Sequence, residues 1–324
     1  QDEEPKKIVL VKKRFLSSFK GPKLVQTLII IVCFGVVIQQ ISSCITKLID
    51  IPVTTYTHFD FNKTISYPSV TFCREPAYNL DDLWEDITYS DQEFFVQYGL
   101  DGSTDNVKLS PTVGFLYGRC YTLTPKTKGT RASKATGYSV TLKHSSEDLD
   151  TASGIHSPGY HVYYLYVSVG ETVDVKLTVD KYSKISGEHD PCTFEKDYSA
   201  NLCVWDLVGE QAGCSGPWMT SDLPRCSNYT TMRDLITAYM NTYQSHSCGS
   251  CPRFCMSYLY NSFVTDRKTL YVWDTNEKKW CMSSGDAALQ TQLYIYFNSM
   301  MVSVYEERFN YDWNLFISDL GGSI

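Results

Sequence analysis

The segment LVQTLIIIVCFGVVIQQISSC, Leu24–Cys44, decides the class of this protein. Its core, Leu28–Ile38, is unbroken apolar sequence, and no Asp, Glu, Lys or Arg lies between Lys23 and Lys47. About 20 such residues cross a hydrocarbon layer about 30 Å thick as an α-helix, because each residue rises about 1.5 Å. We therefore expect a retained transmembrane helix over residues 24–46.

A secretory signal peptide and a buried core helix are the alternatives for this segment. The apolar core has a length that a signal peptide would accept, but no A-x-A-like cleavage site follows it. Residues 1–23 carry seven basic and three acidic side chains. Positive charge gathers on the cytoplasmic side of a span, so we expect a cytoplasmic N-terminus and an extracellular body.

Charge is distributed unevenly along the 324 residues, although the net charge is only −7. After residue 23 the chain holds 22 basic and 33 acidic groups. This acidic body argues against nucleic acid as a partner and is compatible with gathering cations. The 24 Tyr, 15 Phe and 6 Trp supply ample surface for a core, which excludes disorder. Because the chain begins at Gln1 rather than Met, we expect a fragment of a longer protein.

Twelve cysteines are more than a cytosolic domain of this size needs. Cys33 and Cys44 lie in or beside the span. The other ten form an even set in the acidic body, which indicates disulfides and an oxidising compartment: Cys73, Cys120, Cys192, Cys203, Cys214, Cys226, Cys248, Cys251, Cys255 and Cys281. Two glycosylation acceptor triplets, at Asn62 and Asn228, fit extracellular exposure.

The body alternates strand-like and helix-like patterns. We expect helix over residues 81–98, with Leu83, Trp84, Ile87, Phe94 and Phe95 as candidate buried positions, and over residues 231–243, where Thr231 and Asp234 form a capping-box-like start. Aromatic and β-branched content predicts strands at Ser66–Phe72, Tyr138–Lys143, His161–Val169, Thr172–Val179 and Thr291–Val304. The predicted fold class is α+β, with early and late strands meeting in one sheet.

The chain offers little support for an enzyme. It contains no P-loop, Rossmann glycine fingerprint, HExxH or GxSxG, and its six histidines are scattered. Cys248 and Cys251 form a CxxC, but no βαβ context or second pair supports a thioredoxin-like or zinc site. We expect no catalytic residues, no metal site and no cofactor.

Four segments occur in an order that resembles the degenerin/epithelial sodium channel family. They are YPSVTFC (Tyr67–Cys73), GRCYTL (Gly118–Leu123), CGSCPRFC (Cys248–Cys255) and LFISDLGGSI (Leu315–Ile324). The resemblance covers nearly the whole chain and implies a trimeric, sodium-selective channel with two spans per subunit. It also implies a disulfide-rich extracellular domain with a β-sheet palm and a helical thumb. The short interval from Cys73 to Cys120 suggests a reduced finger region.

The resemblance also implies a disulfide scheme. It pairs Cys73 with Cys120 and builds a thumb ladder of Cys192–Cys255, Cys203–Cys248 and Cys214–Cys226. Two ladder cysteines usual in acid-sensing members are missing here, near Ser199 and Ala212, which leaves Cys251 without its usual partner. Cys281 is an additional cysteine, and we predict a Cys251–Cys281 bond as a departure from the common scheme.

By the same resemblance, the end of the chain opens the pore helix. Ser318 falls at the degenerin position, where bulky substitutions hold channels open, and Asp319, Gly321 and Gly322 would line the outer pore entrance. Lys20 and Gly21 stand where the family has an N-terminal gating motif, with an ordinary juxtamembrane turn as the alternative. The expected division is a cytoplasmic segment 1–23, a first span 24–46, an extracellular domain 47–314 and the start of a second span 315–324.

These expectations describe a plasma-membrane, multi-pass channel subunit that conducts Na⁺ and is sensitive to amiloride. Its expected partners are two further subunits of the same family, the lipid bilayer and an extracellular stimulus (a peptide, protons or mechanical force). A single-span receptor or adhesion ectodomain that conducts nothing is the main alternative. A purinergic-type trimer lacks an evident lysine-based nucleotide site here, and a membrane-anchored enzyme is the third alternative.

Overall fold

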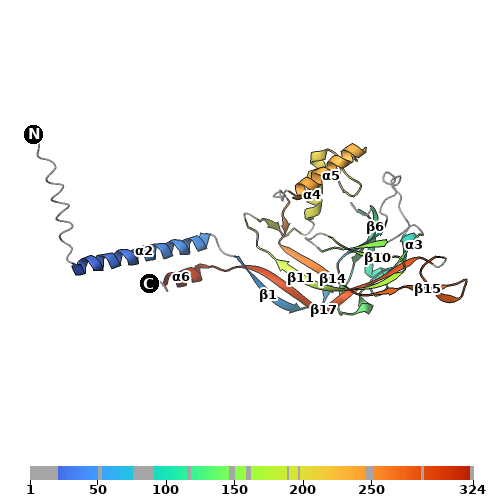
Figure 1. The fold of residues 1–324 in the computed structure, drawn as a ribbon, viewed down its shortest axis with the longest axis horizontal. Helices are drawn as coiled ribbons and strands as arrows, with labels where there is room; N and C mark the ends of the chain where they lie inside the picture. Colours follow the sequence, from blue (N-terminus) through green and yellow to red (C-terminus); the bar gives the residue numbers. More distant parts are fainter. Residues whose placement is uncertain are drawn as a thin grey trace, which may run out of the picture. The chain divides into compact units, whose positions relative to one another are not determined.

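The computed structural model divides the chain into two compact units, Gln1–Thr55 with Glu307–Ile324, and Tyr56–Glu306. Each unit is described by itself, with the elements labelled in Figure 1. The residues that the structure describes are 21–49, 53–75, 91–114, 118–145, 150–157, 162–187, 190–195, 198–244, 251–285 and 288–321.

The first unit contains the long helix α2 (Gly21–Ile49) and the shorter helix α6 (Trp313–Gly321), which pack against each other. Large apolar side chains along α2 are exposed, with Phe34 at 66%. The Thr27 and Thr46 hydroxyls each donate to the carbonyl four residues earlier, so they are satisfied within the helix. In the described part of the chain, one helix is long and apolar enough to cross a membrane, Lys23–Ile49.

The second unit contains a six-stranded sheet in the order β14-β11-β17-β8-β4, with β1 also paired to β17. Its strands are β1 (Val53–Phe61), β4 (Phe95–Gln97), β8 (Tyr138–Lys143), β11 (Glu171–Ser183), β14 (Met256–Thr269) and β17 (Gln290–Phe309). Early and late strands therefore meet in one sheet, as predicted. Alternate side chains of β17 are buried, which places Leu293, Ile295 and Phe297 in the core.

A five-stranded antiparallel sheet in the order β10-β9-β3-β6-β5 shares that core. Its strands are β3 (Val70–Glu75), β5 (Val107–Gly114), β6 (Gly118–Pro125), β9 (Asp150–Ile155) and β10 (Tyr163–Ser168). The buried Tyr138 hydroxyl donates to the Pro68 carbonyl at 2.7 Å. Tyr67 stacks on Phe297 with ring centroids 4.3 Å apart, and a Cβ at Gly129 would come within 2.7 Å of the Tyr67 ring.

Short elements complete this unit. They are the pairs β2 (Ile65–Ser66) with β7 (Lys128–Gly129), β12 (Cys192–Thr193) with β13 (Arg253–Phe254), and β15 (Tyr271–Asp274) with β16 (Lys279–Met282), and the helical turns α3 (Asp91–Phe94), η2 (Thr104–Asn106) and η3 (Lys134–Thr136).

Two helices, α4 (Ala200–Ala212) and α5 (Tyr229–Gln244), pack together around a small separate core. Trp205 stacks on Tyr239 with centroids 4.0 Å apart and meets Trp218 edge-on at 5.4 Å. Ser199 caps the start of α4 by accepting from the Leu202 amide. Sequence analysis did not predict α4.

The α+β class is confirmed, but the strand at 66–72, the end of the helix at 81–98 and the start of the helix at 231–243 differ in detail. The strand expected at 66–72 is interrupted, because Pro68 cannot donate and Tyr67 turns into the core. Residues 95–97 form a strand paired with β8 rather than helix, while Phe94 and Phe95 are buried as expected. Leu83, Trp84 and Ile87 lie outside the described residues.

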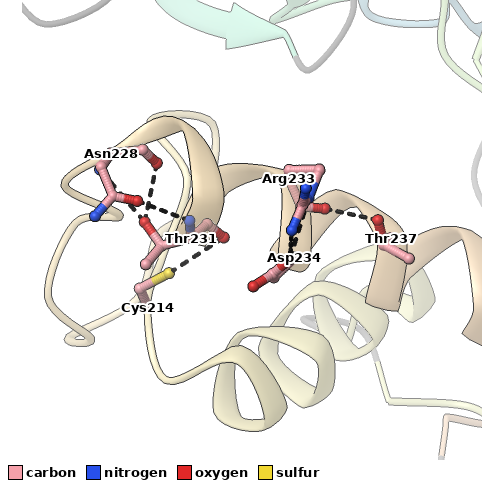
Figure 2. A network of polar contacts seen from close by, with 6 residues as sticks. All are labelled: Cys214, Asn228, Thr231, Arg233, Asp234 and Thr237. Atoms are coloured by element: carbon pink, nitrogen blue, oxygen red, sulfur yellow. Dashed lines mark hydrogen bonds and ion pairs between the residues drawn. The ribbon is translucent and has the colours of Figure 1, made fainter.

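Helix α5 begins two residues earlier than its predicted start, and its cap is Asn228 (Figure 2). The Asn228 Oδ1 accepts from the Thr231 amide at 2.9 Å, and the Asn228 amide donates to Thr231 Oγ1 at 3.3 Å. This reciprocal pair is a capping box with Asn in the first position. The prediction took Thr231 as the cap, but its hydroxyl is the second partner.

A row of hydroxyl groups crosses the five-stranded sheet and ends on a histidine. Thr112 Oγ1 lies 2.9 Å from Thr122 Oγ1, which lies 2.7 Å from Thr71 Oγ1, and His156 Nε2 lies 2.5 Å from Thr71 Oγ1. Burial lowers the pKa of His156 below its usual value, because the charged imidazolium loses hydration there.

This histidine predicts a measurable acid sensitivity. The unfolded chain binds a proton on His156 near pH 6.5 and the folded chain binds it at lower pH. The contribution of the neutral His156 side chain to the free energy of unfolding is therefore fully present above pH 6.5. It falls as the pH drops toward the folded pKa, by at most about 1.4 kcal/mol per pH unit. We expect His156→Gln to flatten the dependence of the melting temperature on pH below 6.5. An unchanged slope in the variant would contradict this prediction.

Candidate pore entrance

Helix α6 carries most of the residues that the resemblance assigns to the pore entrance. Asp312 caps the helix by accepting from the Leu315 amide at 2.8 Å, which fixes where α6 begins. Ser318 is exposed, and a Cβ at Gly321 would meet nothing within 4 Å. These two small residues are three apart and therefore share one face of the helix. Gly322 lies outside the described residues.

Asp319 belongs to a polar contact between the two helices of the first unit. The Tyr311 hydroxyl donates to Asp319 Oδ2 at 3.1 Å, and Lys47 Nζ on α2 lies 3.7 Å from the same oxygen. Lys47 Nζ also lies 5.7 Å from the Tyr311 ring centroid, and the Cys44 side chain forms a hydrogen bond with Tyr311. We call these four residues, Cys44, Lys47, Tyr311 and Asp319, the α2–α6 junction.

The members of the junction differ in exposure. Cys44 and Tyr311 are buried, each at 7%, whereas the side chains of Lys47 and Asp319 are 53% and 41% exposed. An ion pair in this setting contributes about 0–1 kcal/mol, because water screens both charges. The carboxylate is therefore held in place by a hydrogen bond and a weak ion pair. Carboxylate oxygens are also the ligands that hard cations prefer.

The junction contains residues that sequence analysis missed. Ser318 and Asp319 were predicted, but Lys47, Tyr311 and Cys44 were not assigned to the pore entrance. Lys47 could have been noticed as the first charge after the apolar segment, and Tyr311 as the residue before the α6 cap. Lys20 lies outside the described residues, and Gly21 is the first residue of α2.

Four disulfides occur among the described residues. Cys73–Cys120, Cys192–Cys255 and Cys214–Cys226 pair as the resemblance implies. The Cys73–Cys120 bond joins directly opposed residues of β3 and β6. Every one of these eight cysteines lies in the second unit, where the bonds restrict the unfolded chain.

The fourth disulfide corrects our prediction, because Cys203 on α4 bonds to Cys251. Their Cα atoms are 5.8 Å apart, within the range that a disulfide requires. Cys251 is held there because β13 begins two residues later, pairs with β12 and is followed by the Cys192–Cys255 bond. The predicted Cys203–Cys248 and Cys251–Cys281 pairs are therefore wrong. Cys281 is a free thiol on β16, and Cys248 lies outside the described residues.

The described residues hold no group of three or more His, Cys, Asp or Glu side chains that could bind a metal ion. Both glycosylation triplets are exposed, Asn62 between β1 and β2 and Asn228 at the start of α5.

Comparison with known proteins gives one informative match. The family model for the amiloride-sensitive sodium channel matches residues 76–324, well over half of the chain. No curated protein matches the chain. A solved structure described as a proton-activated chloride channel is 10% identical, with 93% of this chain and 89% of that chain covered and a TM-score of 0.39. A likeness at this level carries no argument about the fold or the conducted ion. The family match shows that the chain belongs to the amiloride-sensitive sodium channel family.

Proposed function

We propose that this chain is one subunit of a trimeric, sodium-selective cation channel, gated from outside the cell and blocked by amiloride. The main structural support for this proposal is the α2–α6 junction. In it, Asp319 is held on α6 next to Ser318 and on the same helix as Gly321. Helices from one subunit cannot enclose an aqueous path, so the pore would form between three copies of α6. Na⁺ would be the permeant ion, and no cofactor would be needed.

Gating would act through the strands that lead into the helices. Strand β1 follows α2 in the chain, β17 precedes α6, and the two strands pair in the six-stranded sheet. A stimulus that shifts this sheet would move the ends of both helices together. Such a stimulus acts by binding one state of the sheet more tightly than the other.

Electrical recording of the parent chain tests this function. We expect oocytes that express it to show a current whose reversal potential follows external Na⁺ and which amiloride blocks. Peptides, protons and shear would be screened as stimuli. A reversal potential that follows Cl⁻ would overturn cation selectivity. A surface-expressed chain that carries no current under any of these stimuli, even with bulky residues at Ser318, would favour the non-conducting receptor instead.

Lys47 should reduce the attraction of cations to the entrance. Replacing it with Met keeps the length of the side chain and removes the charge that lies 3.7 Å from Asp319. We expect Lys47→Met to raise single-channel Na⁺ conductance about two- to fivefold at low ionic strength, with little effect at high salt. Lys47→Arg keeps the charge and is the matched control. An equal rise in both variants would show that charge is not the cause.

In the proposed topology residues 1–23 face the cytoplasm at the plasma membrane, and Asn62 and Asn228 face outward and carry glycans. The Asn228 cap uses Oδ1, while the side-chain nitrogen, which would carry the glycan, points away from Thr231 in Figure 2. Capping and glycosylation at Asn228 are therefore compatible.

Matched substitutions separate the two roles of Asn228. Asn228→Asp and Thr230→Ala should both remove the glycan and keep the cap, since Asp caps as well as Asn does. Asn228→Ala should remove the glycan and also lower the free energy of unfolding by about 1 kcal/mol. Glycosidase-sensitive gel mobility and thermal unfolding measure the two effects. Equal mobility of wild type and all three variants would contradict an extracellular Asn228.

A further inference from the structure

Two phenylalanines at the end of β1 are exposed beside a glycosylation triplet. Strand β1 ends at Phe61, and Asn62, Lys63 and Thr64 follow it as an exposed turn. Phe61 is 75% exposed and Phe59 is 67% exposed. Alternate residues of a strand point to the same side, so the two rings share one face of β1. We call this pair the phenylalanine face, and exposed apolar patches of this kind mark interaction sites.

The acceptor turn is anchored on both sides. Before it, β1 pairs with β17, and the Asn62 amide donates to the Met300 carbonyl of β17 at 3.1 Å. After it, β2 pairs with β7, with Ile65 opposite Gly129. A group attached to Asn62 therefore starts from a defined point next to the phenylalanine face.

The distances along β1 suit a sugar attached to Asn62. Neighbouring Cα atoms are about 3.8 Å apart, and three residues of an extended strand span about 10 Å. Because β1 ends at Phe61, strand alternation does not hold the Asn62 side chain to the opposite face. The first sugar can therefore reach Phe61, and the second can reach Phe59.

Sugar and phenyl rings are complementary in shape and in charge distribution. One side of an N-acetylglucosamine ring presents C–H groups, which carry a small positive charge. The face of a phenyl ring is negative because of its quadrupole, so the two flat surfaces attract each other. Contact also removes the apolar surface of both rings from water. The phenylalanine face thus fits a carbohydrate.

The charges near the phenylalanine face favour a neutral, tethered occupant. His58 and Asp60 lie on the opposite face of β1, with Nε2 and Oδ1 3.5 Å apart, and Lys63 lies in the turn. One lysine is not the basic cluster that docks on anionic lipid, and a neutral sugar requires no charge. Covalent attachment at Asn62 gives the sugar a high effective concentration. The same glycan would obstruct the approach of another protein.

We propose that the glycan on Asn62 packs on the phenylalanine face and stabilises the folded chain through that contact. The partner of this exposed patch is then a carbohydrate that the chain itself carries. This inference rests on the glycosylation of Asn62 in the proposed function.

Thermal unfolding of the full chain in detergent tests the inference. Every variant carries Thr230→Ala, which removes the triplet at Asn228. Thr64→Ala then removes the glycan at Asn62, and we expect it to lower the melting temperature by about 2 °C or more. When both rings are absent, in Phe59→Leu with Phe61→Leu, Thr64→Ala should cause less than about a third of that shift. An equal shift with and without the rings would overturn the proposal.

A matched control and gel mobility complete the experiment. Phe263 on β14 is 54% exposed, and Phe263→Leu should leave the full effect of Thr64→Ala in place. Loss of the effect in this control would overturn a specific role of the phenylalanine face. If Thr64→Ala leaves gel mobility unchanged, Asn62 carries no glycan, which overturns both its glycosylation and the packing. A changed mobility with a shift that does not depend on the rings overturns the packing alone.

Discussion

Replacing Ser318 with tryptophan is expected to hold the channel open and to raise the resting current about tenfold or more. Ser318 is exposed on α6 and shares a face with Gly321. In the proposed trimer three such faces converge on one axis, where only small side chains allow close approach. An indole at this position would destabilise the closed packing more than the open one, and a few kcal/mol suffice to shift a 1:99 equilibrium largely to the open state.

Two controls accompany this variant in oocyte recordings. Ser318→Ala keeps a small side chain and should leave the resting current low. Ile317→Trp adds the same bulk one residue earlier, about 100° around the helix, and should have a much smaller effect. Surface labelling must show equal amounts of each protein. A resting current that is unchanged in Ser318→Trp, or raised equally by Ile317→Trp, would refute the placement of Ser318 on the pore axis.

Loss of the Cys203–Cys251 bond is expected to have a large effect on folding. This disulfide closes a loop of 48 residues between α4 and the start of β13. The chain-entropy treatment gives a loss of about 4 kcal/mol for a loop of that length, a large part of a typical folding free energy. We expect Cys203→Ser and Cys251→Ser to be retained inside the cell, with little protein at the surface.

Cys281→Ser is the matched control, because Cys281 is a free thiol in the structure. It should reach the surface as wild type does, and peptide mapping without reduction should join the peptides of Cys203 and Cys251. A peptide that joins Cys251 to Cys281, or severe retention of Cys281→Ser, would restore the pairing that we first predicted.

An element of this fold was predictable where one local sequence pattern, such as an apolar run or a strand-like alternation, dominates. The apolar run Leu24–Cys44 predicts one long helix, and α2 covers it. The alternation in β17 likewise reports a half-buried strand, since one face meets the core. The central strands β8 and β11 followed from β-branched and aromatic content in the same way.

Other elements depend on tertiary contacts that the local sequence does not reveal. Residues 95–97 become a strand because β8 offers an edge for pairing. Helix α4 was missed partly because it contains Gly209, a poor helix former. A Cβ at Gly209 would come within 2.8 Å of the Met219 side chain, so a larger residue there would require that side chain to move.

The candidate site shows the same limit. The resemblance placed Ser318 and Asp319. Lys47 and Tyr311 are far apart in the sequence, and only folding brings them to the same carboxylate. Spacing could not decide between Cys248 and Cys251 as the partner of Cys203, because the two are only three residues apart. The β12–β13 pairing made that choice in the structure.

The pairing of β1 with β17 has a consequence for engineering. The second unit, Tyr56–Glu306, begins on one of these strands and ends on the other, so the chain enters and leaves it through neighbouring strands of one sheet. Its two ends are therefore already close together, which is the condition for a domain to be inserted, exchanged or circularly permuted as a cassette. A chimaera that swaps only this cassette between relatives would exchange the unit that we propose responds to the stimulus and would leave every residue of the α2–α6 junction in place.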